Sequence, residues 1–352
     1  MTPFCDFFVL LHLRMPTLHI FNPEHDIALA SNLSNFTAPH AGRQLRQDLG
    51  FLPVLWASSG DRILVDNEEF TLASAAHAID RIEPWGWDRA IRRQLVRLRY
   101  PECLMPSVEQ LDHIRSLSHR RTSSRLLPQL RVEGTVGEAF ECKNTEEIRE
   151  LMQAYGRMVI KAPWSSSGRG VKFSDASHLD SITNWVKGVI ERQGSVMAEP
   201  LYNKVKDFGM EFSVDAMGSI HYEGLSLFHT VNGAYVGNIL ATEQRKRDMI
   251  SHYLPLSLLD TIAHLITQTP LLDDYQGLFG IDMMVCSADE NETGSGRYLL
   301  HPCVEINLRR TMGHVALALA PPTDDMVNVM SIELTDHYRM IIQPLQENKT
   351  IE

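Results

Sequence analysis

Apolar residues recur along the chain at two spacings, which predicts a protein that mixes strands with helices. Short apolar runs predict strands at 17–21, 52–56, 62–65 and 103–105, and helical spacing predicts helices near 41–49 and 88–99. Because these strands alternate with helices, we expect an open α/β layer over roughly the first hundred residues.

The remainder of the chain continues the mixture of strands and helices. Helices are expected at 108–117, 145–155, 179–193 and 256–269, and strands at 157–162, 171–174, 196–199, 208–216, 220–226, 278–286 and 298–307. Asn144 or Thr145 should cap the helix 145–155, whose first turn carries Glu146 and Glu147. The strands 208–216 and 220–226 should form a hairpin, and 323–342 should close the chain as one or two helices.

The length of the chain indicates two or three units that share an interface. A chain of 352 residues exceeds one ordinary domain. Residues 1–15 are expected to be a disordered extension, with Met15 as an alternative start. A basic cluster at 119–121 marks the first boundary, so the expected units are 16–118, 119–200 and 201–352.

Composition narrows the class of protein. Hydrophobic residues at 44% and charged residues at 22% are typical of a soluble globular enzyme. A net charge of −11 argues against a nucleic-acid-binding protein, and no apolar run approaches the roughly 20 residues of a membrane-spanning helix. Five scattered cysteines without a CxxC pair favour a reducing compartment, so we expect a cytoplasmic protein.

A loop rich in serine and glycine follows the strand that ends near Lys161. Two glycines allow close approach to a ligand, and serine hydroxyls and loop amides offer hydrogen bonds to phosphate oxygens. The Walker pattern is absent, and the loop leads into a strand. The alternative is a Ser-rich hairpin with an incidental lysine. The candidate phosphate-binding residues are Lys161, Ser165, Ser166, Ser167, Gly168 and Gly170.

Three oxygen-bearing side chains near the end of the chain predict a metal site. Glu305 and Asn307 share one face of a strand, and a hairpin pairing Asp282 with Glu305 has its midpoint in the polar segment 289–296. Two neighbouring carboxylates repel unless a cation lies between them, and oxygen ligands suit magnesium. The alternatives are a solvated sheet face, or zinc bound by His301, Cys303 and Glu305 on a shared face.

Charged residues flank this site in the sequence. Arg309 and Arg310 could stabilise charge on a transferring phosphoryl group or clamp a substrate carboxylate, although a basic turn is the alternative. The charged segment 24–26 follows the first strand, where open α/β sheets bind ligands, although an ordinary charged turn is the favoured interpretation.

Taken in order, these motifs resemble the ATP-grasp superfamily over Arg120 to Ala320, and in particular its carboxylate-amine and peptide ligases. The resemblance implies a layer of the pre-ATP-grasp type at 16–118, and ATP held between lobes at 119–200 and 201–352. By the resemblance, Lys161 and the 165–170 loop would contact the phosphates of ATP, and Arg120 lies in the region of a further phosphate contact. Glu199 to Leu201 would form the hinge that meets adenine, and Glu211 would bind ribose. Asp282, Glu305 and Asn307 would bind magnesium, or manganese in its place.

The implied activity is ATP-dependent ligation of a carboxylate to an amine through an acyl phosphate, with Lys161, Arg309 and Arg310 as catalytic residues. D-alanine ligases carry an arginine two residues before the first metal-binding acid, where this chain has Gly280. The alternatives are a small-molecule kinase and a non-catalytic nucleotide-binding protein. The expected partners are small molecules, neither nucleic acid nor membrane, while the substrates and the formation of a homodimer stay open.

Overall fold

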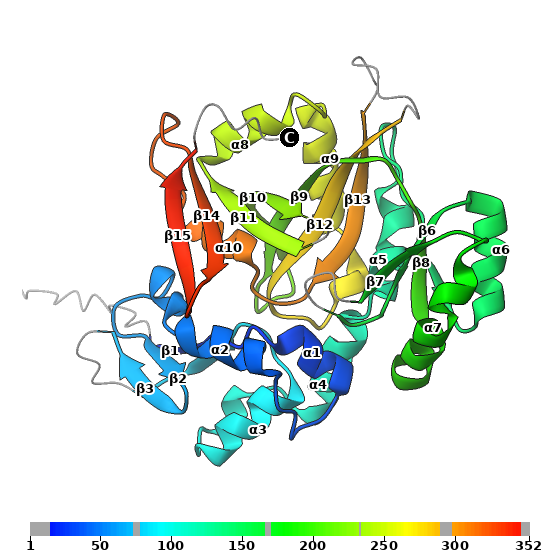
Figure 1. Cartoon of the computed structure of the whole chain (residues 1–352). Helices are drawn as coiled ribbons and strands as arrows, with labels where there is room; N and C mark the ends of the chain where they lie inside the picture. The colour runs from blue at the N-terminus through cyan, green and yellow to red at the C-terminus, as the bar shows by residue number, and fades with distance from the viewer. Residues whose placement is uncertain (1–14, 73–77, 166–169, 232–233, 289–297, 346–352) are drawn as a thin grey trace, which may run out of the picture.

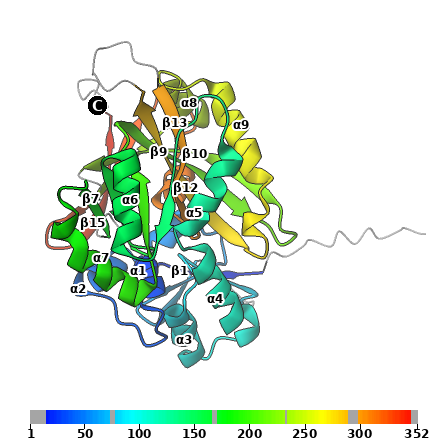
Figure 2. The ribbon, with the colours of Figure 1, turned by 90° about the vertical axis from the view of Figure 1, so that its right-hand side faces the viewer.

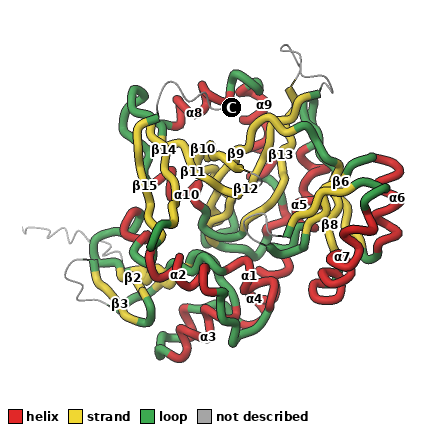
Figure 3. Tube along the Cα trace, viewed as in Figure 1, coloured by secondary structure: helices red, strands yellow, loops and turns green. Residues whose placement is uncertain are grey.

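The computed structural model describes residues 15–72, 78–165, 170–231, 234–288 and 298–345. Three sheets organise the chain (Figure 1). Figure 3 shows helices beside each of the sheets. No helix of the described ranges is long and apolar enough to cross a bilayer.

The first sheet carries the amino-terminal layer. Its strands are β1 (Thr17–Ile20), β2 (Arg62–Val65), β3 (Glu68–Thr71) and β4 (Arg81–Pro84), in the order β3-β2-β1-β4. β1 is parallel to β2 and β4, as expected of an open α/β layer. The helices of this layer are α1 (His25–Ser31), α2 (His40–Asp48), α3 (Arg89–Arg97) and α4 (Val108–Leu117). Leu18 and Ile20 pack against Ile91 and Leu95 of α3.

The second sheet is antiparallel. It contains β5 (Phe140–Cys142), β6 (Met158–Lys161), β7 (Val171–Ser174) and β8 (Val196–Pro200) in the order β5-β8-β6-β7. After α5 (Arg121–Leu126) come α6 (Thr145–Tyr155) and α7 (Leu179–Gln193), which lie on the outer side of this sheet (Figures 1 and 2). The Asn144 side chain caps α6 by accepting from the amide of Glu147 at 2.9 Å, as predicted.

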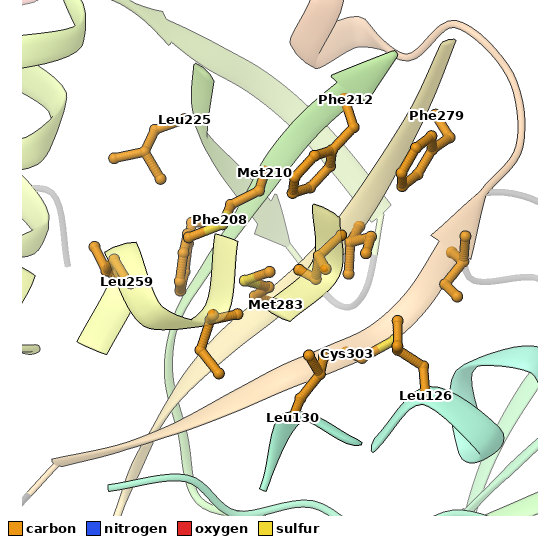
Figure 4. Close-up of a cluster of buried hydrophobic side chains, with 14 of the residues drawn as sticks. Leu126, Leu130, Phe208, Met210, Phe212, Leu225, Leu259, Phe279, Met283 and Cys303 are labelled. Carbon is orange, nitrogen blue, oxygen red and sulfur yellow. The ribbon is translucent and has the colours of Figure 1, made fainter. Parts of the chain in front are cut away.

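The third sheet has seven antiparallel strands and the largest core. They are β9 (Lys204–Val214), β10 (Ile220–Val231), β11 (Ala234–Leu240), β12 (Gly277–Ser287), β13 (Tyr298–Asn307), β14 (Asn328–Leu334) and β15 (Tyr338–Pro344). The associated helices are α8 (Glu243–Ile250), α9 (Leu256–Thr267) and α10 (Met312–Ala318). Phe212 stacks on Phe279 with ring centroids 5.1 Å apart, and α9 covers this apolar face with Leu259 (Figure 4).

Three sequence predictions of secondary structure are wrong. Residues 52–56 and 103–105 form short 3-10 turns at Leu52–Leu55 and Glu102–Leu104 in place of strands. Pro53 inside the first turn lacks the N–H that a strand ladder needs. The predicted closing helices are the strands β14 and β15, because β14 pairs with the open edge of β11. The domain boundaries drawn from the sequence stay a proposal.

Candidate functional site

Asp282 and Glu305 face each other on neighbouring strands of the large sheet. The register of β12 and β13 pairs Asp282 with Glu305, which confirms the hairpin predicted from the sequence. Their neighbours Ile281 and Ile306 point to the opposite face and belong to the main core. The Asn307 amide donates to Asp282 Oδ2 at 3.2 Å, so the three oxygen-bearing side chains form one group.

Asp282 and Glu305 repel each other when both carboxylates are ionised. Burial, with a further contribution from the charge of Glu305, raises the pKa of Asp282 to about 7. A cation between the two carboxylates would remove this repulsion, and two carboxylates with an amide oxygen suit magnesium. The described residues contain no group of three or more His, Cys, Asp and Glu that could hold a metal alone. The set therefore fits a magnesium ion that also has phosphate or water ligands.

The zinc alternative does not fit the structure. A register shift follows Asp282 in the pairing of β12 with β13, so strict alternation of faces along β13 is lost. Cys303 packs beside Leu126 and Leu130 in the main core (Figure 4). The expectation that His301, Cys303 and Glu305 share a face is therefore wrong.

Arg120 connects the candidate metal group, formed by Asp282, Glu305 and Asn307, to the serine-rich loop between β6 and β7. Its guanidinium donates to Glu305 Oε1 at 2.7 Å, to Ser165 Oγ at 2.8 Å and to the carbonyl of Ala162. The side chain is buried, and although burial alone would lower the pKa of Arg120, the charge of Glu305 raises it above its ordinary value. Residues far apart in the sequence thus meet around one permanent positive charge.

Lys161 lies at the end of β6, beside the neighbouring strand β8. Its Nζ donates to Glu199 Oε2 at 2.6 Å, and both side chains are buried. The amide of Leu201 donates to the carbonyl of Arg157 at 2.9 Å, so Leu201 would meet a nucleobase through its carbonyl group. The structure therefore brings Lys161 close to the segment from Glu199 to Leu201, which the resemblance assigns to adenine binding.

The loop between β6 and β7 is closed at its base. The amide of Ala162 donates to the carbonyl of Gly170 at 2.7 Å. A side chain at Gly170 would overlap that of Ser165, which accounts for glycine there. Ser166, Ser167 and Gly168 lie outside the described residues. The prediction that this loop leads into a strand, here β7, is confirmed.

Glu211, the acid that the resemblance assigns to ribose, is buried beside the start of α10. It lies on β9 opposite Gly280, its carboxylate accepts from the Thr311 hydroxyl at 2.8 Å, and His314 Nδ1 is 3.0 Å away. Burial, which is its largest cause, raises the pKa of Glu211 to about 8. The assignment of Glu211 to ribose binding stays a prediction.

The two consecutive arginines reach different acids of the amino-terminal layer. Arg309 donates to both oxygens of Asp26, at 3.0 and 2.9 Å, and to Asn307 Oδ1 at 3.1 Å. Arg310 lies over the ring of Trp56, with its Cζ 4.2 Å from the centroid, and its Nη2 is 3.9 Å from Glu83. Arg309 therefore contacts the candidate metal group through Asn307, while Arg310 contacts residues at the edge of the first sheet.

Sequence reasoning missed the part played by Asp26. The favoured interpretation of 24–26 was a charged turn, but Asp26 is bound to an arginine 283 positions away. Its place after the first strand was the one available signal. Ser123 was also missed; its hydroxyl accepts from the amide of Ile306 at 3.2 Å and so fixes the strand beside Glu305.

The three sheets and their connections have the arrangement of the ATP-grasp fold. A structure that supports this assignment is N5-carboxyaminoimidazole synthetase from Staphylococcus aureus complexed with ADP. It has a TM-score of 0.51 and 13% identity, with 91% of this chain and 82% of that chain covered.

Other solved structures are similar at lower scores. The biotin carboxylase domain of 2-oxoglutarate carboxylase from Hydrogenobacter thermophilus has a TM-score of 0.48 and 12% identity, covering 72% of this chain and 58% of that chain. D-alanyl-alanine synthetase A from Vibrio cholerae has a TM-score of 0.42 and 14% identity, covering 84% of this chain and 89% of that one. No protein-family model and no curated protein sequence matches the chain.

Proposed function

We propose that the protein is an ATP- and magnesium-dependent ligase that phosphorylates a substrate carboxylate and passes the acyl group to an amine. The observation that carries this proposal is the double contact of Arg120, which joins Ser165 of the candidate phosphate loop to Glu305 of the candidate metal group. This arrangement suits a triphosphate that lies between the two sheets with its charge facing cations and metal ligands.

The nucleotide site is assigned in two parts. The phosphates would be bound by Arg120, Lys161 and the loop from Ser165 to Gly170, including Ser166, Ser167 and Gly168. The hinge from Glu199 to Leu201 would meet adenine. The similarity in fold to a synthetase complexed with ADP supports a nucleotide ligand for this protein.

The metal site is assigned to Asp282, Glu305 and Asn307. Magnesium, when bound there, supplies positive charge to the phosphate oxygens and orients them. Glu305 would exchange part of its interaction with Arg120 for that ion. The chain's own contribution is the rigid pairing of β12 with β13, which fixes the two carboxylates on one face.

The proposed reaction needs no nucleophile from the protein. A substrate carboxylate attacks the γ-phosphorus in line, the bond from that phosphorus to the bridging oxygen breaks, and ADP leaves. The amine then attacks the acyl phosphate carbon, and inorganic phosphate leaves as the amide bond forms. Lys161 and Arg309 would stabilise negative charge on the transferring group, because both are positive and held in place by acids.

The amino-terminal layer is proposed to bind the acceptor, because it supplies Asp26 and Glu83 to the two arginines. The scattered cysteines support a cytoplasmic location.

The test is ADP release in the presence of magnesium, across amino acids, dipeptides and small organic acids, each with and without an amine. One acid and one amine together should stimulate ATP cleavage, and Glu305→Ala should abolish it while leaving the fold intact. Glu333→Ala, which alters an exposed glutamate of β14, is the matched control. Full activity of Glu305→Ala would refute the assignment, and a stable phosphorylated product with no need for an amine would identify a kinase.

A further inference from the structure

A second polar cluster lies where β1 and β4 meet Arg310, apart from the metal group. We define it by His19 of β1, Trp56, Glu83 of β4 and Arg310. β1 and β4 are parallel and pair His19 with Glu83, and the amide of Arg310 donates to the carbonyl of Trp85 at 2.9 Å, just beyond the end of β4. The carboxyl ends of parallel strands are where open α/β sheets bind ligands.

The donors of this cluster lack acceptors. The guanidinium of Arg310 is only 15% exposed, yet its ion-pair partner Glu83 is 3.9 Å away, beyond hydrogen-bond distance. The indole N–H of Trp56 is buried and has no hydrogen-bond partner within the described ranges. Burial lowers the pKa of Arg310 to about 10, although Glu83 partly opposes this.

One pair of acceptors in the cluster has no donor between its two atoms, although the other oxygen of Glu83, Oε1, is 2.8 Å from Nη2 of Arg81. His19 Nε2 is 3.2 Å from Asp61 Oδ2, so this nitrogen carries the proton of the neutral ring and Nδ1 is an acceptor. Nδ1 is buried, has no hydrogen-bond partner in the described part of the chain, and faces Glu83 Oε2 at 3.5 Å. Burial lowers the pKa of His19 below its ordinary value, which favours the neutral ring. Two acceptors therefore face each other with no hydrogen between them.

The unpaired indole N–H of Trp56 and the guanidinium of Arg310 lie beside two facing acceptors, His19 Nδ1 and Glu83 Oε2. A ligand that carries both a negative and a positive group would satisfy both sets. A carboxylate would pair with the guanidinium of Arg310, which Trp56 holds by stacking, and an ammonium group would pair with Glu83 and His19 Nδ1. Because Arg310 and Glu83 are only 3.9 Å apart, the two charges of the ligand must be close together. That requirement favours an α-amino acid over a long-chain zwitterion.

We propose that His19, Trp56, Glu83 and Arg310 form a binding subsite for the α-amino group and α-carboxylate of a free amino acid. The identification of this amino acid as a substrate rests on the proposed ligase function, whereas its binding does not. Arg309 is unsuited to the same task, because Asp26 already occupies its guanidinium with two hydrogen bonds.

The test is calorimetric titration of the full chain, without ATP, with each standard α-amino acid and with the methyl ester of any that binds. At least one amino acid should bind, and Arg310→Met and Glu83→Gln should each weaken it about tenfold or more. Arg339→Met, at an arginine of β15 that is 59% exposed, should leave binding unchanged. The ester should bind more weakly than the acid, because it lacks the negative charge.

Absence of binding by every amino acid would show that the cluster holds only water and would overturn the proposal. Equal affinity of Arg310→Met and the unmodified protein, or of ester and acid, would also overturn it. If Arg310→Met does not fold, Glu83→Gln decides, since it changes charge at constant size. Amino-acid binding without ATP cleavage would sustain the subsite and refute the ligase, so the two failures are distinguishable.

Discussion

Asp26 and Arg309 form a two-point ion pair between the amino-terminal layer and the strand that carries Glu305. The guanidinium donates to both carboxylate oxygens, and the two side chains are only 20% and 18% exposed. Although burial alone would raise it, the charge of Arg309 holds the pKa of Asp26 below its ordinary value. The helix α1 of the amino-terminal layer therefore fixes a cation of the proposed phosphoryl-transfer site.

Asp26→Asn should lower kcat about tenfold while changing the KM for ATP little, because the neutral amide orients Arg309 less firmly. The loss in folding stability should be about 1 to 3 kcal/mol, measured by urea unfolding. Glu24→Gln is the control, since Glu24 pairs with Arg46 at 2.7 Å and does not contact Arg309. An unchanged kcat in Asp26→Asn would show that Arg309 needs no anchor.

Lys161→Met should weaken ATP binding about ten- to a hundredfold, because a charge-assisted contact to phosphate contributes about 1.5 to 3 kcal/mol. Lys172→Met on the exposed part of β7 should bind ATP normally. Calorimetry of both variants without acceptor isolates the binding step. Equal affinities would remove Lys161 from the nucleotide site.

Glu211 predicts a dependence of folding stability on pH. Its pKa is about 8 in the folded protein against an ordinary value of 4.5, so the folded state holds a proton that the unfolded state has released. This contribution to stability is complete below pH 4.5 and is lost as pH rises through about 8. Glu211→Gln removes the titration, so its melting temperature relative to the unmodified protein should rise across that window. A difference that does not vary with pH would contradict the shifted pKa.

Gly280 predicts a steric effect at the same place. A Cβ there would lie 2.5 Å from Glu211 Oε2 and 2.8 Å from Thr311 Cγ2. Gly280→Ala should therefore destabilise the protein by about 1 to 3 kcal/mol. Adding Glu211→Ala should remove the closer of the two contacts and recover part of the loss, whereas Gly42→Ala in α2 meets nothing closer than 3.6 Å and should be neutral or stabilising. A stable Gly280→Ala protein would show that the Glu211 pocket can expand.

Local signals sufficed for part of the fold. The bounds of α6 and its cap at Asn144 follow from residues adjacent in the chain. The pairing of Asp282 with Glu305 was also predictable, because a single hairpin fixes its own register. In contrast, Met326, Met330 and Leu334 recur at helical spacing, and only pairing with β11 makes 328–334 a strand.

Long-range contacts set the limit of prediction at the site. The resemblance suggested Arg120 as a phosphate contact, yet its hydrogen bonds to Ser165 and Glu305 depend on how two sheets approach each other. The ion pair between Asp26 and Arg309 could not be predicted, because the sequence around neither residue indicates its partner. Glu211 was placed at ribose by analogy, and the side chains of Thr311 and His314 that enclose it come from a distant helix start.

The central claim is that Asp282 and Glu305 bind a metal ion that holds ATP, and calorimetric ATP binding with and without magnesium tests it most directly. Magnesium should strengthen ATP binding to the unmodified protein and to Asp180→Asn, a control at a residue that is 95% exposed. Asp282→Asn should lose most of that gain, because it removes one of two carboxylate ligands. An equal gain from magnesium in Asp282→Asn would contradict the account.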